Sequence, residues 1–445
     1  MKPSPYNHFF PISGSEIILA YNAFNGALAE IERSNYARVM QLLANPSDAS
    51  SAQDHEFVHC LKEGGFLIGE PVDQTATLQA TARRLRRMDS ILGLTVAPTL
   101  ACNFRCDYCF EAHSNVRMSE PTQDALLKFC DRQLQRAEGL RVWWFGGEPT
   151  ICMPILDRVQ TNLLELAAKH NAEVDSGEII TNGYLLDATM ARHLHGLQIT
   201  KAQVTIDGPE AIHDRRRKLA NGDGTFRRII DNLSEAADIM EINVRINIDK
   251  ENVDSAFEVV DILRQRGILP KIKVHFGQVL SMGSACANLR DRCFSDLDFS
   301  RVRVEIYNKL HEMGVYVYQY PTVRTAGTSC GALAEGYFVV GPDGHMYRCW
   351  EDISLGSEKA IGSVFTPESV DDRQRQNLEA YRSWDPFAMA ECRSCGILPV
   401  CMGGCPALSM QLNEGKIGRC IPTKYHLGDF VALRYRCETQ PKAES

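Results

Sequence analysis

A regular alternation of strand and helix patterns between residues 91 and 314 constrains the fold more than any other feature of this chain. Strands that alternate with helices predict a parallel sheet with right-handed crossover connections. Six such units predict an α/β fold, a partial (β/α)6 TIM-like barrel that is shorter than the complete barrel. The candidate strands are Ile91–Ala97, Arg141–Phe145, Glu178–Thr181, Lys201–Ile206, Asn243–Ile248 and Lys271–Phe276. The candidate helices are Pro121–Arg136, Pro154–His170, Phe226–Met240 and Ser255–Arg266.

The two ends of the chain differ from this central part. Tyr6–Ile12 and Ile17–Ala23 alternate in a way that predicts a hairpin, and helical patterns follow near Ser34–Leu43 and Asp54–Glu63. Residues 1–90 therefore resemble a small winged-helix module, or alternatively a structural cap on the next domain. After about residue 315 the periodicity weakens and seven cysteines follow, so we expect residues 315–445 to form a cysteine-rich domain held by metal.

Composition narrows the class of protein. The net charge of −8 argues against a general nucleic-acid binder, and we expect the basic run Arg215–Lys218 to be a solvated helix face. The sequence has no apolar stretch long enough to span a bilayer and no signal-peptide pattern, so we expect a cytoplasmic protein that does not bind membranes. In that reducing compartment the sixteen cysteines serve better as metal ligands than as disulfides.

Three of these cysteines follow the first strand directly. Cys102, Cys106 and Cys109 have the spacing C-x3-C-x2-C, and Tyr108 precedes the third. Three thiolates can hold three irons of a [4Fe–4S] cluster and leave the fourth iron open to a small molecule, whereas the clusters of electron carriers usually take four cysteines. A zinc site is the alternative, but zinc needs a fourth ligand, for which His113 is the nearest candidate.

The three-cysteine loop resembles the signature of the radical S-adenosylmethionine (radical SAM) enzymes. The segment Gly146-Gly147-Glu148-Pro149 after the second strand resembles the GGEP segment of that family, and segments around Thr181, Asp207 and Arg245 are weaker matches. The resemblance implies a bound SAM molecule, which an electron from the reduced cluster splits into methionine and a 5′-deoxyadenosyl radical. A reductant such as flavodoxin or ferredoxin would supply that electron.

The resemblance also implies roles for individual residues. The segment Gly146, Gly147, Glu148 and Pro149 would hold the amino group of SAM, and Thr181 and Asn182 are further candidates for cofactor binding. Arg245 would contact the SAM carboxylate, or alternatively form a salt bridge in the barrel wall. Tyr108 would lie near the adenine, or simply pack the loop.

A second array of seven cysteines, with Gly344 between the first two, resembles the SPASM domain of peptide-modifying radical SAM enzymes. This resemblance implies two auxiliary [4Fe–4S] clusters. The outer one would be bound by Cys392, Cys395, Cys401 and Cys420, and the inner one by Cys330, Cys349 and Cys405.

The inner set lacks one ligand, because Gly336 stands where some relatives have a further cysteine. An open iron there could bind a substrate thiol, and metal binding deprotonates a thiol. Cys286 or Cys293 could instead supply the missing ligand, and one or two structural zinc ions are the alternative for the whole array.

Together these features predict a radical SAM peptide maturase that installs an oxidative cross-link, preferably a thioether, in a precursor peptide. Residues 1–90 would grip the leader sequence of that peptide by strand addition. Glu351, Asp352 and Asp207 are candidate catalytic bases by position, although each can be an ordinary turn carboxylate. The alternatives are a carbon–carbon cross-linking enzyme, a sulfatase-type formylglycine maturase and a non-catalytic electron-relay or peptide-binding scaffold. Trp350 weakens the sulfatase reading, because those maturases carry an aspartate at that position.

Overall fold

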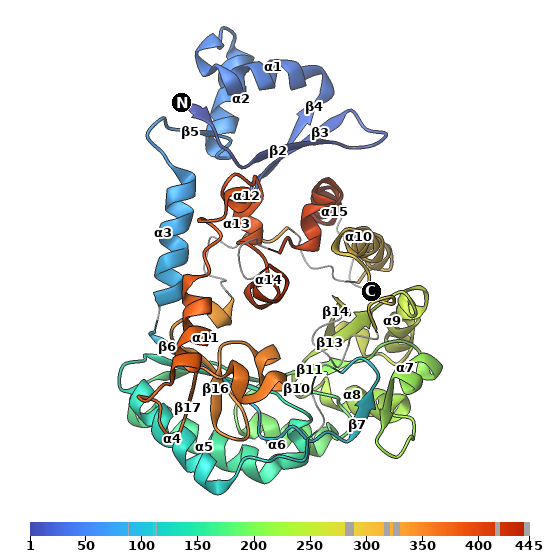
Figure 1. Cartoon of the computed structure of the whole chain (residues 1–445). Helices are drawn as coiled ribbons and strands as arrows, with labels where there is room; N and C mark the ends of the chain where they lie inside the picture. The colour runs from blue at the N-terminus through green and yellow to red at the C-terminus, as the bar shows by residue number, and fades with distance from the viewer. Residues whose placement is uncertain are drawn as a thin grey trace. The chain divides into compact units, whose positions relative to one another are not determined.

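The computed structural model describes residues 1–87, 89–109, 111, 114–280, 289–315, 321–323, 330–413 and 419–439 (Figure 1). The chain divides into two compact units. The terminal unit comprises Met1–Arg86, Asp296–Cys330 and Trp384–Ser445, and the central unit comprises Arg87–Ser295 and Gly331–Ser383. The domain limits at residues 90 and 314 stay predictions.

The central unit contains the predicted parallel sheet. Its six parallel strands lie in chain order across the sheet, which confirms the alternating pattern. The strands are β6 (Ile91–Val96), β8 (Gly139–Trp144), β10 (Gly177–Thr181), β11 (Ile199–Thr205), β13 (Glu241–Ile248) and β14 (Ile272–Gln278). The connecting helices are α4 (Glu120–Leu134), α5 (Met153–Lys169), α6 (Ala188–Gly196), α7 (Glu210–Arg216), α8 (Phe226–Ala236) and α9 (Ala256–Gln265).

Helix amphipathicity and local capping explain these elements. Helix α8 buries Ile229, Ile230 and Leu233 at helical spacing. The Ser119 side chain accepts a hydrogen bond from the Thr122 amide at the start of α4, and Asp187 caps α6 in the same way. Alternate residues of β8, Leu140, Val142 and Trp144, are buried, and so this strand contributes one face to the core.

Three strands that the sequence did not predict extend the same sheet. Strand β15 (Tyr337–Val340) pairs with β6 in parallel, and β16 (His345–Tyr347) and β17 (Gly362–Ser363) follow antiparallel. Tyr337 packs where a side chain on Gly93 would stand, and its hydroxyl bonds the Thr95 hydroxyl at 2.6 Å. Residues 331–383, which we assigned to the C-terminal domain, thus continue the central sheet.

The remaining elements of the central unit are short. Strands β7 (Phe104–Cys106) and β12 (Arg217–Leu219) pair antiparallel, and β9 (Glu173–Val174) pairs with β8. Helix α11 (Asp372–Ser383) is the last element of the unit along the chain. The 3-10 helices are η2 (Pro149–Cys152), η3 (Val253–Ser255), η4 (Leu269–Lys271), η6 (Gly331–Leu333) and η7 (Trp350–Lys359).

The terminal unit begins with a small sheet and two helices. Strands β2 (Asn7–Pro11) and β3 (Ile17–Asn22) form the predicted hairpin, and β4 (Leu28–Glu32) adds a third antiparallel strand. Helices α1 (Arg33–Ala44) and α2 (Ala52–Glu63) lie on one side of this sheet (Figure 1). Strand β1 (Lys2–Pro3) pairs with β5 (Leu67–Ile68), and 3-10 helix η1 (Pro46–Asp48) links α1 to α2.

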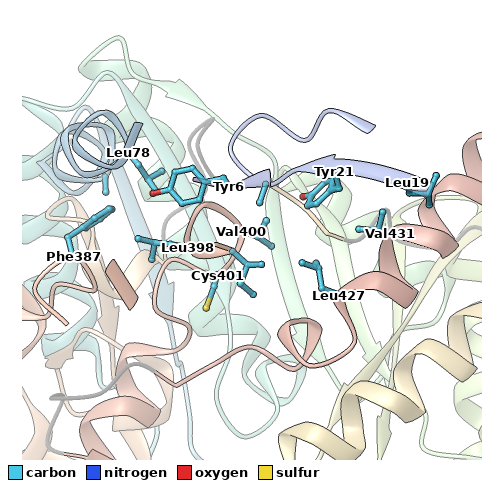
Figure 2. Packing of buried hydrophobic residues seen from close by; sticks show 13 residues of the cluster. Tyr6, Leu19, Tyr21, Leu78, Phe387, Leu398, Val400, Cys401, Leu427 and Val431 are labelled. Atoms are coloured by element: carbon cyan, nitrogen blue, oxygen red, sulfur yellow. The ribbon is translucent and has the colours of Figure 1, made fainter. Parts of the chain in front are cut away.

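The rest of the terminal unit is helical. It contains α3 (Gln74–Arg87), α10 (Asp296–Glu312), α12 (Ala390–Arg393), α13 (Leu398–Cys401), α14 (Pro406–Asn413), η8 (Pro422–Lys424) and α15 (Leu427–Thr439). One hydrophobic core joins the first strands to α3, α13 and α15, and its side chains point toward one another in Figure 2. Across the described residues, every helix is too short or too polar to cross a bilayer.

Candidate active site

One cavity of the central unit, about 340 Å³ in volume, collects loops from the carboxyl ends of the parallel strands. Many of the residues predicted to bind a cluster or a cofactor line it together. They are Cys102, Cys106, Tyr108, Cys109, Gly146, Gly147, Thr181, Asn182 and Arg245, and the proposed base Glu351 lines it as well. Sequence positions from 102 to 351 therefore converge on one space.

The cysteine loop is fixed by the β7–β12 pair. Cys106 lies opposite Arg217 in this pair, and the Asp107 amide donates to the Arg216 carbonyl at 3.1 Å. The Ala220 amide donates to the Asn103 carbonyl at 2.8 Å. The segment after α7 thus holds the backbone of the loop along most of its length.

The paired glycines bring the loop after β8 against the cysteine loop. The amides of Gly147 and Glu148 donate to the carbonyls of Thr99 and Ala101 at 3.1 and 2.9 Å. A Cβ on Gly147 would overlap the Ala101 carbonyl, so only glycine fits there. The close approach is therefore made to the backbone of the cysteine loop.

Glu148 supports the cavity wall from behind and does not line the cavity. Its carboxylate is fully buried and accepts hydrogen bonds from the hydroxyls of Thr150 and Thr181 at 2.6 and 2.7 Å. It also accepts from the Asn182 amide at 2.7 Å, which fixes the loop after β10. Burial raises the pKa of Glu148. Pro149 is also buried and begins η2 outside the cavity lining.

Tyr108 is held by two arginines that the sequence analysis placed in solvent. Arg217 and Asn247 donate to its hydroxyl at 2.6 and 3.1 Å, and the Arg216 guanidinium lies 5.1 Å from its ring centroid. Burial raises the pKa of Tyr108 well above its ordinary value, so the hydroxyl stays protonated. The solvated-face prediction is wrong for Arg216 and Arg217, which are 0% and 8% exposed.

The signal for these buried cations was the pair of aspartates that follow two neighbouring strands. Arg216 Nη1 lies 2.9 Å from the Asp249 carboxylate, and its Nε lies 3.6 Å from Asp207. Both aspartates are fully buried, and charges buried in proteins are normally paired. The Arg292 guanidinium forms ion pairs with Asp249 at 2.9 Å and with Asp107 at 2.8 Å. It therefore connects the cysteine loop to the end of β13.

The three predicted carboxylate bases occupy different environments. Asp207 accepts from the Asn247 amide at 3.2 Å and lies beside Arg216, and Asp352 accepts from the Tyr381 hydroxyl at 2.7 Å. Neither lines the cavity. Glu351 does line it, and burial raises the pKa of Glu351 to about 7 against the opposing effect of Arg245.

Glu111 is a cavity carboxylate that the sequence analysis missed. It lies two residues beyond Cys109 and is 7% exposed. Burial, followed by the nearby Glu351 carboxylate, raises the pKa of Glu111 to about 8. A glutamate in a polar loop carries no pattern that distinguishes it, so only the fold reveals its position.

Burial also controls the thiols of the cysteine loop. It raises the pKa of Cys102 and of Cys109 to about 12, with smaller contributions from Glu148 and Cys106 respectively. Both are therefore neutral thiols at pH 7 unless a metal displaces the proton. Within the described residues no three His, Cys, Asp or Glu side chains converge closely enough for a single metal ion. A [4Fe–4S] cluster instead takes one cysteine at each iron.

The outer set of C-terminal cysteines lines a second cavity, of about 260 Å³, inside the terminal unit. Cys392, Cys395, Cys401 and Cys420 all contribute to it. Gly404 has φ +77° and packs where any Cβ would overlap the Arg419 carbonyl, which brings the turn after Cys401 against the residue before Cys420.

The inner set divides between the units. Cys330 and Cys405 belong to the terminal unit, and Cys349 belongs to the central unit. Burial raises the pKa of Cys405, and the nearby Cys330 adds to this effect. Cys293 packs with Val279, Leu289 and Tyr108 beside the first cavity. The alternative ligand Cys286 lies outside the described residues.

Residues 96–276, from the end of β6 to β14, match the radical SAM superfamily. The chain therefore carries a radical SAM domain at these residues, as the cysteine motif predicted. Enzymes of this superfamily use SAM and a [4Fe–4S] cluster. A cysteine-type anaerobic sulfatase-maturating enzyme from Clostridium perfringens is 24% identical over 351 residues, 71% of this chain and 88% of that enzyme.

Two solved structures share the fold. The structure described as native anSMEcpe with bound AdoMet has a TM-score of 0.58 at 19% identity, covering 78% of this chain and 99% of that one. Streptococcus suis SuiB bound to precursor peptide SuiA has a TM-score of 0.54 at 14% identity, covering 94% of this chain and 98% of that one.

Proposed function

We propose that Cys102, Cys106 and Cys109 hold the [4Fe–4S] cluster and that SAM occupies the rest of the central cavity. The three thiols share this cavity, whose volume of about 340 Å³ falls in the range of small-molecule sites. When bound, SAM and the reduced cluster supply a 5′-deoxyadenosyl radical. The residues of the chain bind and orient the two cofactors and exclude water around them.

Arg245 is the proposed partner of the SAM carboxylate. It lines the cavity, and its Nε donates to Asn247 Oδ1 at 2.8 Å. Among the described residues its terminal nitrogens have no hydrogen-bond partner, so a carboxylate can bind there. Gly277 on the neighbouring strand makes room for the guanidinium, because a Cβ there would meet it at 2.8 Å. The same cavity wall offers the Thr181 and Asn182 side chains and the backbone of Gly146 and Gly147.

We further propose that the C-terminal cysteines hold two auxiliary [4Fe–4S] clusters. Four thiols in one cavity support Cys392, Cys395, Cys401 and Cys420 as ligands of the outer cluster. Cys330, Cys349 and Cys405 would bind the inner cluster. Gly336 at the place of a fourth ligand supports an open iron there, which would bind a cysteine thiolate of the substrate.

The proposed reaction is the oxidative cross-linking of a ribosomally made precursor peptide, with a thioether as the favoured product. The peptide loses two hydrogen atoms in this reaction. Glu351 is the proposed base for the proton, because it is the one of the three candidate carboxylates that lines the cavity. The N-terminal sheet and helices would bind the leader sequence, and the likeness to SuiB, which was solved with its precursor peptide, includes this part of the chain.

The observation that carries the proposal is the convergence of the three cysteines, Arg245 and Glu351 on one cavity. The test is to incubate anaerobically reconstituted protein with SAM, a strong reductant and cysteine-containing precursor peptides. We expect 5′-deoxyadenosine and a peptide lighter by two hydrogen atoms whose cysteine no longer reacts with iodoacetamide. A product with an intact free cysteine would favour a carbon–carbon cross-link. Absence of 5′-deoxyadenosine in cluster-loaded protein would favour a scaffold.

A formylglycine maturase is the second candidate, because the chain matches 88% of the length of a cysteine-type sulfatase-maturating enzyme. Against it stands Trp350, which stacks on Phe145 in the cavity wall with ring centroids 5.7 Å apart, where those maturases carry an aspartate. An aldehyde-reactive probe distinguishes the two products, since formylglycine labels and a thioether does not.

A further inference from the structure

A lysine enters the cavity formed by the outer cysteines. Lys424 lies at the end of η8, four residues after Cys420, and its Nζ donates to Cys420 Sγ at 3.2 Å. Lys424 and the four outer cysteines line the same cavity. The Lys424 amide donates to the Ile421 carbonyl at 3.1 Å, so a local turn fixes the distance between the lysine and the thiol.

The other charged side chains at this cavity differ from Lys424. Arg419 directs its guanidinium to Asp296 through two hydrogen bonds of 3.0 and 2.7 Å, and so its charge is compensated. Glu391 also lines the cavity and is exposed. Among the ion pairs found in the described ranges, none includes Lys424, and the sulfur of Cys420 is the side-chain acceptor that it contacts there.

We infer that Lys424 raises the reduction potential of the outer auxiliary cluster by donating a charged hydrogen bond to the sulfur of Cys420. This inference rests on the proposed cluster ligands. Reduction adds one negative charge to the cluster, and a nearby cation stabilises the more negative state. Hydrogen bonds to the sulfurs and net charge are among the factors that set the potentials of such clusters. Lys424 is exposed to solvent, so screening limits the size of the effect.

The test compares the midpoint potentials of the auxiliary clusters in full-length protein whose Cys102, Cys106 and Cys109 are changed to alanine. An EPR-monitored redox titration follows each cluster. In Lys424→Met we expect the redox equilibrium of one cluster to shift about fivefold toward the oxidised form, a potential lower by about 40 mV at 59 mV per tenfold change. Lys424→Arg keeps the charge, so its potential should lie close to that of the parent protein.

Arg393→Met is the matched control, because Arg393 follows Cys392 directly and is exposed but does not line the cavity. Its potentials should equal those of the parent protein. Equal potentials in Lys424→Met and the parent would overturn the inference. If Lys424→Met loses iron, Lys424→Gln, which keeps a donor without the charge, replaces it, and an unchanged potential would again overturn the inference.

Iron analysis separates this failure from failure of the proposed ligands. Cys392→Ala should remove about four irons per chain, one cluster's content. If Cys392→Ala keeps all of its iron, then the ligand assignment is wrong whatever Lys424 does. If it loses them and Lys424→Met leaves the potentials unchanged, then only the role of the lysine is wrong.

Discussion

At the scale of single residues, the cysteine loop depends on side chains that hold it from outside the cluster position. Arg217 donates to the Tyr108 hydroxyl at 2.6 Å from the strand opposite Cys106. Lys218, the next residue, is exposed. These neighbours on one strand have the same charge and different surroundings.

We expect Arg217→Met to lower 5′-deoxyadenosine formation at least tenfold, because a buried charged hydrogen bond is worth about 1.5–3 kcal/mol and orients Tyr108 over the cavity. Lys218→Met should keep the parent rate. The measurement is the initial rate of SAM cleavage at matched iron content. Equal rates for both variants would show that Tyr108 needs no such support.

Gly147 permits a second prediction at this scale. Gly147→Ala must displace the Ala101 carbonyl and with it the cysteine loop, at a cost of about 1–3 kcal/mol. We expect lower iron incorporation and little SAM cleavage. Gly196→Ala, at the end of α6 where the added methyl meets open space, is the control and should bind iron normally. Full iron content in Gly147→Ala would contradict the close packing.

The sequence predicted which residues line the site better than it predicted the role of each residue. The cysteines and the paired glycines converge on the cavity because each set follows a strand of the parallel sheet, and Arg245 reaches it from within β13. Arg216 and Arg217 were missed, since a basic run has the same pattern in solvent and against buried aspartates. Glu148 was expected at SAM, and the structure shows its carboxylate bonded to Thr181 and to the Asn182 amide in the cavity wall, a role that the sequence did not predict.

At the scale of elements, sequence pattern located the parallel strands and the helices α4, α5, α8 and α9 between them, but it did not locate the 17-residue helix α10. The six parallel strands, β6, β8, β10, β11, β13 and β14, are five to eight residues long and were predicted. Strands β15, β16 and β17 have four, three and two residues, which is too few to show a period. They form because β15 pairs with the distant β6, β16 pairs with β15, and β17 pairs with β16.

A buried arginine fixes these short strands, which leads to a prediction. Arg348, 4% exposed, donates to the carbonyls of Ala332 and Tyr337 at 3.0 and 2.7 Å. Arg348→Met would leave these carbonyls unsatisfied, at a cost of about 1–3 kcal/mol. We expect faster hydrogen exchange in β15 and β16 by mass spectrometry, with β13 unchanged as the internal control. Unchanged exchange in β15 would show that its pairing with β6 is sufficient.

At the scale of the whole molecule, residues from both ends of the chain share the core of the terminal unit. Tyr6, Leu19 and Tyr21 pack with Leu398 and neighbouring residues of the cysteine-rich segment (Figure 2). His8 Nε2 lies 3.0 Å from the Gly396 carbonyl, beside Cys395. The N-terminal sheet and the outer cysteine segment therefore fold as one unit. Sequence pattern could not show this, because nothing in it records which distant apolar residues meet.

Because the core is shared, we expect a destabilising substitution near the C-terminal end of the chain to destabilise the N-terminal strands as well. Leu398→Ala should cost about 2–5 kcal/mol as a large-to-small change in a core. We expect faster hydrogen exchange in β2 and β3 and a loss of outer-cluster iron. Leu297→Ala, at a residue 52% exposed in the same unit, is the control. An increase in hydrogen exchange that is confined to residues 384–439 would contradict a common core.

The central claim is that three cysteines hold a cluster whose open iron binds SAM. The most direct measurement is the EPR spectrum of the reduced protein with and without SAM. The account predicts that SAM changes the signal of one cluster, and that the signal and its change disappear when Cys102, Cys106 and Cys109 become alanine while the auxiliary signals remain. A spectrum that SAM leaves unchanged in fully cluster-loaded protein would contradict the account.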